Sequence, residues 1–131
     1  MSKKVLVVDD HVPTRALIRT ILEAEKTEQF EVSEAGSGTE CLRTTDQKGP
    51  FDLILLDVNL PDMDGYSVCR AIRHVDKKVP VVFVTAKGDL KDYTAGREAG
   101  GDSYLVKPIA RAALRSIVNL FTSIERSERP D

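Results

Sequence analysis

Four short apolar segments of the chain each run directly into a charged or hydroxyl-bearing residue. Apolar runs of this length, bounded by turn-forming residues, are typical of strands in a parallel sheet that is buried on both faces. In an open α/β sheet, ligands bind at the carboxyl ends of the strands. We therefore expect the residues that follow the four segments to meet at one edge of the sheet: Asp9 and Asp10, Asp57, Thr85, and Lys107.

Strand and helix patterns alternate five times along the 131 residues. This alternation predicts an α/β fold of three layers, with a parallel sheet between helices and right-handed crossovers. Five such units fit a flavodoxin-like (βα)5 arrangement with strand order 2-1-3-4-5. We expect strands at residues 4–9, 30–35, 53–57, 81–85 and 103–106, and helices after Pro13, at 38–45, 66–74 and 90–99, and after Pro108.

Apolar residues at helical spacing predict which face of a helix is buried. Ser37 and Asp89 stand just before two of the helices as candidate caps. We expect the first helix to bury Leu17, Ile18, Ile21 and Leu22, and the last helix to bury Leu114, Ile117, Val118, Phe121 and Ile124.

Length and charge limit the kind of protein. The length suggests one domain at residues 1–124, followed by a charged tail or linker stub at 125–131. A net charge of −2 argues against nucleic-acid binding, which usually requires a basic face. No apolar stretch approaches the roughly 18 residues of a membrane span. The first strand begins too close to Met1 for a signal peptide, so we expect a cytoplasmic protein with Cys41 and Cys69 reduced.

Three carboxylates at one edge of a sheet repel one another, so either one of them stays protonated or a bound cation neutralises them. The open strand ends favour the cation. Mg²⁺ binds one or two carboxylates, keeps several waters and accepts phosphate oxygens as its other ligands. The ammonium of Lys107 and the hydroxyl of Thr85 suit further phosphate oxygens. Asp57 would be central and next to the metal, where its carboxylate could act as a nucleophile that forms an aspartyl-phosphate.

At these residues the chain closely resembles the receiver domain of two-component response regulators, in particular a single-domain, chemotaxis-regulator-like receiver. The resemblance extends from about Lys4 to Ile124. All four motifs occur in order and at the expected spacings, which makes the signal strong. They are Val-Asp-Asp at 8–10, Leu-Asp-Val-Asn-Leu-Pro-Asp-Met-Asp-Gly at 56–65, Val-Thr-Ala at 84–86 and Tyr-Leu-Val-Lys-Pro at 104–108.

The resemblance implies a phosphoryl-transfer site. Asp57 would receive a phosphoryl group from a phosphohistidine, on a histidine kinase or a histidine phosphotransfer protein. Asp10 would bind Mg²⁺, or Mn²⁺ in its place, directly, while Asp9 would help through water. Asp57 and the backbone carbonyl of Asn59 would complete the protein ligands. The domain would catalyse its own phosphorylation and dephosphorylation and would not be a conventional turnover enzyme.

The resemblance also implies a switch. Thr85 and Lys107 would contact the phosphoryl group, and Tyr104 would turn inward as Thr85 moves toward it. The Lys107–Pro108 peptide bond is expected to be cis. The fourth helix, fifth strand and last helix would form the output surface for a downstream protein or effector domain. The domain would be a monomer or a phosphorylation-dependent dimer, and would contact neither nucleic acid nor membrane.

Departures from the family pattern are small. Gly101 stands where the family often has alanine, and we expect it to loosen the turn before the last strand. Asn59 and Lys87 occupy positions that tune how long the phosphoryl group persists in receivers, in a direction that the sequence does not give.

Two other functions remain open from the residues. A phosphohydrolase of the haloacid dehalogenase type also uses an aspartyl-phosphate and Mg²⁺. Two features argue against this function. Asn59 stands where that family needs a general acid–base, a role that an amide cannot fill. The candidate nucleophile, Asp57, follows the third strand, whereas in that family the nucleophile lies on the first. The other alternative is a binding module on the same fold that is never phosphorylated, which the complete set of site residues disfavours.

Overall fold

The five expected strands pair in parallel in the order β2-β1-β3-β4-β5, so the predicted topology is confirmed. The computed structural model describes residues 2–86, 88, 90–124 and 128–129. The strands are β1 (Lys3–Val8), β2 (Phe30–Ala35), β3 (Leu53–Leu56), β4 (Val81–Thr85) and β5 (Ser103–Val106), and the helices are α1 (Val12–Glu23), α2 (Gly38–Lys48), α3 (Gly65–Val75), α4 (Leu90–Glu98) and α5 (Arg111–Thr122).

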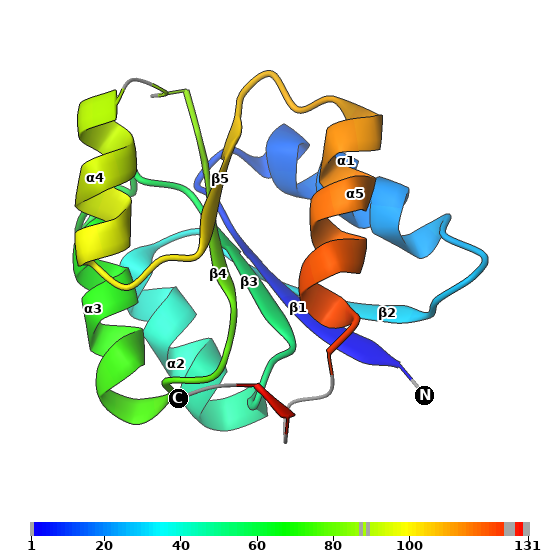
Figure 1. Ribbon diagram of the computed structural model, residues 1–131, viewed down its shortest axis with the longest axis horizontal. Helices are drawn as coiled ribbons and strands as arrows, with labels where there is room; N and C mark the ends of the chain where they lie inside the picture. The colour runs from blue at the N-terminus through cyan, green and yellow to red at the C-terminus, as the bar shows by residue number, and fades with distance from the viewer. Residues whose placement is uncertain (1, 87, 89, 125–127, 130–131) are drawn as a thin grey trace.

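Helices cover both faces of the sheet, with α1 and α5 on one face and α2, α3 and α4 on the other (Figure 1). Successive residues of a strand point to opposite faces, so each central strand supplies both layers of the core. In β1, Val5 and Val7 pack with α1 and α5, whereas Leu6 and Val8 pack on the side of α2 and α3. A strand buried on both faces has no polar face, which explains why the central strands are continuously apolar.

Local sequence signals set several helix ends. The Ser37 hydroxyl accepts a hydrogen bond from the Glu40 backbone N–H and caps α2, as predicted. Pro13 lies in the first turn of α1, where its missing N–H leaves no partner unsatisfied. Beyond α4, Gly100 adopts a φ of 98°, a left-handed conformation that favours glycine. The other predicted cap, Asp89, lies outside the described residues.

The predicted burial of two residues, Leu17 and Ile124, is wrong. Leu17 is 47% exposed and Ile124 is 49% exposed, so both face solvent. In α1, the face that contacts the sheet is made by Ile18, Ile21 and Leu22. Leu17 belongs to the same apolar segment of the sequence but lies outside this face. Ile124 lies beyond the last residue of α5 and no longer follows the helical spacing.

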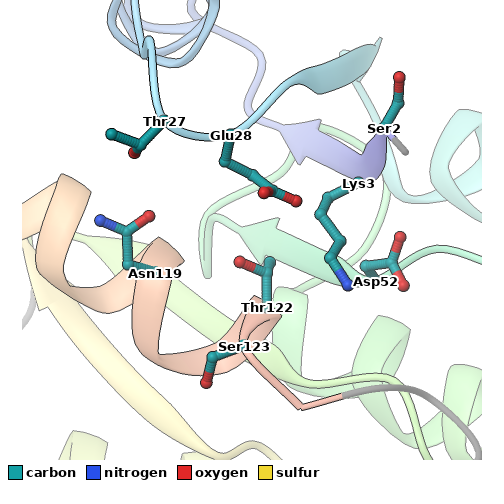
Figure 2. Close-up of a pocket in the computed structure, with 8 residues that line it drawn as sticks. All are labelled: Ser2, Lys3, Thr27, Glu28, Asp52, Asn119, Thr122 and Ser123. Atoms are coloured by element: carbon teal, nitrogen blue, oxygen red, sulfur yellow. The ribbon is translucent and has the colours of Figure 1, made fainter.

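The amino-terminal ends of the strands form the edge of the sheet opposite the aspartates. Arg129, near the end of the chain, is buried there: its Nε donates to the Ile124 carbonyl and its Nη2 lies 3.4 Å from Asp52 Oδ1. Figure 2 shows a polar cavity of about 670 Å³ at this edge, with Lys3 and Asp52 on one side and Asn119 on the other. This cavity is remote from the aspartate cluster and takes no part in the chemistry described below.

At Gly101 the absence of a side chain makes room for an aromatic ring. A Cβ atom built at Gly101 would lie 2.3 Å from Phe83 Cε2, well inside contact distance. We therefore expect Gly101→Ala to lower the free energy of unfolding by about 1–3 kcal/mol, measured by urea denaturation. In the background of Phe83→Leu, the same substitution should cost clearly less. An equal cost in both backgrounds would show that the contact with Phe83 is not the cause.

Candidate functional site

Three carboxylates meet at the carboxyl ends of β1 and β3, the edge at the top of Figure 1. β1 and β3 are neighbours in the sheet, so Asp9 and Asp10 after one strand lie beside Asp57 after the other. One oxygen from each carboxylate lies within 4.8 Å of the others. Asp9 and Asp57 are 2% and 5% exposed, and Asp10 is exposed to solvent. The cluster is therefore mostly buried and opens to water at Asp10.

Lys107 reaches this cluster from the end of β5. Its Nζ lies 2.7 Å from Asp9 Oδ2 and donates a hydrogen bond of 3.0 Å to Asp57 Oδ2. The backbone N–H of Lys107 donates to the Thr85 carbonyl at 2.8 Å, which fixes the end of β5 against the end of β4. The following bond, Lys107–Pro108, is cis. One ammonium thus bridges two buried carboxylates that come from different strands.

The loop after β3 is folded tightly around Asp57. The Asn59 backbone N–H donates to Asp57 Oδ1 at 3.1 Å, and the Gly65 N–H donates to the Val58 carbonyl at 2.7 Å. A Cβ atom at Gly65 would lie 2.3 Å from the Asp57 carbonyl oxygen, so only glycine allows α3 to begin so close to Asp57. Asp64 caps α3 by accepting from the Ser67 N–H. The loop that carries Asn59 is therefore fixed at both ends.

Two further residues hold the loops of the site, and the sequence pattern did not identify either. Arg15 donates to the Asp9 backbone carbonyl at 2.6 Å and to Glu34 Oε1 at 2.9 Å. Asp62 accepts from the backbone N–H groups of Gly38 and Thr39 at 2.8 and 2.9 Å, which adds a second cap to α2. The Thr39 hydroxyl also donates to Asp62 Oδ2 at 2.6 Å, and this bond together with the two backbone bonds lowers the pKa of Asp62 to about 2. No local signal could have found them, because the partners of Asp62 lie more than 20 residues away.

The two predicted switch residues lie on neighbouring strands. Thr85 ends β4 and is fully buried, and Tyr104 in β5 is half-buried. The Tyr104 hydroxyl lies 2.7 Å from the hydroxyl of Tyr66, a residue of α3 that the sequence did not single out. Lys87, the predicted modulator of phosphate lifetime, lies outside the described residues.

Burial dominates the electrostatics of the site. It raises the pKa of Asp57 above the usual value for a carboxyl, with a further increase from the negative charge of Asp9. The Lys107 ammonium and the Asn59 N–H oppose this increase without cancelling it. Burial lowers the pKa of Lys107, but the two carboxylates outweigh burial and the pKa is raised. Lys107 therefore stays protonated and can neutralise only part of the cluster.

The donor set fits a hard divalent cation. Lys107 Nζ lies 2.7 Å from Asp9 Oδ2, but this buried oxygen accepts no hydrogen bond of good geometry among the described residues. The single ammonium offsets one of the three negative charges, and a buried carboxylate that is not neutralised is costly unless a further cation is nearby. Asp9, Asp10 and Asp57 offer oxygen ligands only, which Mg²⁺ prefers. These three residues could hold such an ion and leave coordination positions for water and phosphate.

Asp57→Asn should stabilise the metal-free protein at neutral pH. Because burial raises the pKa of Asp57 in the folded state, ionised Asp57 favours the unfolded chain, and the contribution of this residue to stability falls as pH rises above the ordinary pKa of 3.8. We expect a gain in unfolding free energy of order 1 kcal/mol at pH 7. The gain should disappear below about pH 4. Urea denaturation at both pH values in chelator measures it, and a gain that is independent of pH would contradict this assignment.

Among relatives, the chain matches the family model described as the response regulator receiver domain over residues 5–119. The transcriptional regulatory protein PrrA of Mycobacterium tuberculosis is 43% identical over 113 residues, which are 86% of this chain and 47% of that protein. The probable transcriptional regulator ycf27 of Cyanophora paradoxa is 36% identical over 129 residues, 98% of this chain and 51% of that protein. The chain thus spans about half the length of the curated relatives it matches.

Solved structures agree with this match. A CheY-like receiver domain protein from Methanospirillum hungatei superposes with a TM-score of 0.86 at 26% identity and covers 98% of both chains. A putative response regulator from Chloroflexus aurantiacus gives a TM-score of 0.86 at 32% identity, covering 95% of this chain and 100% of that one. In the part of the chain that the structure describes, no helix is both long and apolar enough to cross a membrane. From its sequence, its fold and the residues at its sheet edge, the chain belongs to the response regulator receiver domains of two-component systems.

Proposed function

We propose that Asp57 accepts a phosphoryl group from a phosphohistidine in a Mg²⁺-dependent reaction. The observation that carries this proposal is the position of Asp57 between two further carboxylates and Lys107. A carboxylate oxygen of Asp57 would attack phosphorus, and the bond between phosphorus and the imidazole nitrogen would break. The imidazole leaves with the electron pair of that bond. The donor would be a histidine kinase or a histidine phosphotransfer protein.

The residues around Asp57 have separate tasks in this reaction. Asp9, Asp10, Asp57 and the carbonyl of Asn59 would hold Mg²⁺, which when bound offsets negative charge on the phosphoryl oxygens. Lys107 would contact one phosphoryl oxygen, as its ammonium already lies beside Asp57. The burial of Asp57 limits the access of water, so the domain's own dephosphorylation would be slower than in an open site.

The signal would leave the site through Thr85 and Tyr104. The hydroxyl of Thr85 would contact the phosphoryl group, and Tyr104 would change its position in response, which alters the surface of α4, β5 and α5. Phosphorylation would shift an equilibrium between two arrangements of this surface. A downstream protein or effector domain would bind the phosphorylated arrangement, either to a monomer or to a dimer formed on phosphorylation.

The length of the relatives bears on the output. Because the chain spans about half of relatives named as transcriptional regulators, an effector domain in the same polypeptide is one source of output. A separate partner protein is the other. The proposed boundary at residue 124, with 125–131 as a tail or linker, suits either arrangement, and so does a cytoplasmic location. Family membership disfavours the phosphohydrolase alternative, and the experiment below tests the unphosphorylated binding module.

Incubation with Mg²⁺ and acetyl phosphate tests the proposal directly. We expect intact mass spectrometry to detect the gain of one phosphoryl group in the wild type and none in Asp57→Asn. The beryllofluoride complex provides the control for rapid hydrolysis, because it occupies the same site without being turned over. A wild type that binds Mg²⁺ but neither gains mass nor binds beryllofluoride would favour the binding module.

Asp10→Asn should weaken Mg²⁺ binding at least tenfold, because it removes an ionised oxygen ligand from a site that has few. Isothermal titration calorimetry at pH 7 measures the affinity. Asp46→Asn, which changes an exposed aspartate of α2 outside the cluster, is the matched control for net charge and should leave the affinity within twofold. Equal losses in the two variants would mean that overall charge, and not ligation by Asp10, determines the affinity.

A further inference from the structure

Two tyrosine hydroxyls join three elements of the fold at one point. Tyr66 in α3 and Tyr104 in β5 lie 38 residues apart, yet their hydroxyl oxygens are 2.7 Å apart. The Tyr104 hydroxyl donates to the backbone carbonyl of Asp92 in α4 and can accept from the Tyr66 hydroxyl, which itself lies 3.3 Å from the same carbonyl oxygen. Figure 1 shows α3 and α4 on the same face of the sheet, with β5 at its edge. The hydroxyl pair therefore fixes β5 to both of these helices.

The ring of Tyr104 is held as closely as its hydroxyl. Its centroid lies 5.2 Å from that of Phe83 and 4.6 Å from that of Tyr93, the latter in an edge-on contact. On the third side is Gly96 of α4, where a Cβ atom would lie 2.6 Å from Tyr104 Cε2 and 2.7 Å from its hydroxyl oxygen. The ring occupies this place only because residue 96 has no side chain.

Tyr66 is also linked to the acceptor. It directly follows Gly65, which starts α3 against the Asp57 carbonyl oxygen. Tyr66 packs edge-on against Phe83, with centroids 5.1 Å apart, and Phe83 stands two residues before Thr85 on β4. A change at Asp57 or Thr85 thus reaches the hydroxyl pair through short segments of α3 and β4.

We propose that Tyr66 is a positioning residue that holds Tyr104 in its resting place until Asp57 is phosphorylated. The proposal rests on the function proposed above, in which Tyr104 changes position during switching. Movement of the Tyr104 ring breaks the bond between the two hydroxyls, so this bond stabilises the resting arrangement alone. By linkage, a ligand that selects the switched arrangement binds more weakly while the bond is present.

The affinity for beryllofluoride, a phosphoryl mimic, at saturating Mg²⁺ tests this role. We expect Tyr66→Phe, which removes only the hydroxyl, to bind beryllofluoride roughly three- to tenfold more tightly, as expected for the loss of one hydrogen bond. Tyr104→Phe, which also loses the bond to the Asp92 carbonyl, should tighten binding at least as much. Adding Tyr66→Phe to Tyr104→Phe should give no further gain, because the bond between the two hydroxyls is already absent. Tyr93→Phe is the matched control, since Tyr93 contacts Tyr104 through its ring, and should stay within twofold of wild type.

Two further measurements separate a positioning role from general loosening of the fold. The Mg²⁺ affinity of Tyr66→Phe should equal that of the wild type, whereas a distorted site would bind both ligands more weakly. Gly96→Ala, which displaces the Tyr104 ring without touching Tyr66, should also tighten beryllofluoride binding. If the wild type binds beryllofluoride but Tyr66→Phe and Gly96→Ala bind it no more tightly, the positioning role of Tyr66 is overturned. The proposed function of Asp57 is then unaffected. A wild type that fails to bind beryllofluoride would overturn the proposed function as well.

Discussion

The site depends on a single ammonium placed between two buried carboxylates. Lys107 contacts Asp9 and Asp57 from the end of β5, and it can do so only because β1, β3, β4 and β5 end at one edge of a parallel sheet. One positive charge does not neutralise three carboxylates, so the cluster retains a negative charge in a place of low solvent access. That remaining charge would favour a divalent cation at the site, and it adds to the cost of burying Asp57.

Close backbone approaches connect this charged edge to the rest of the molecule. Gly65 lets α3 begin against Asp57, Gly101 leaves room for Phe83, and Gly96 leaves room for Tyr104. At each of these positions the absence of a side chain allows a direct contact between two elements of the fold. The segments between Asp57 and the α4 and β5 surface are therefore short and closely packed, as the proposed switching requires.

Much of the fold was predictable because the central strands are buried on both faces and read as continuous apolar runs, as β4 does. The predicted bounds of β4 agree with the structure, and so do those of the edge strands β2 and β5, which are only partly buried. The errors concern helix faces, because helical spacing does not show how much of a helix contacts the sheet. Leu17 belongs to an apolar run in α1 but lies outside its contact with the sheet, and Ile124 lies beyond the end of α5. Helical spacing gives the direction of a face, whereas tertiary packing decides its width.

The sequence by itself determined the topology, because strand burial and βα alternation are local patterns. It also determined which residues follow the strands, and parallel strands bring their carboxyl ends together at one edge. Asp9, Asp10, Asp57, Thr85 and Lys107 could all be placed at one edge on that ground. Only the tertiary structure decided which side chains fix them in place. These side chains are Arg15, which donates to the Asp9 carbonyl, Asp62, which caps α2, and Tyr66, which contacts Tyr104. Their partners lie outside their own elements, and no periodicity in the sequence reveals such contacts.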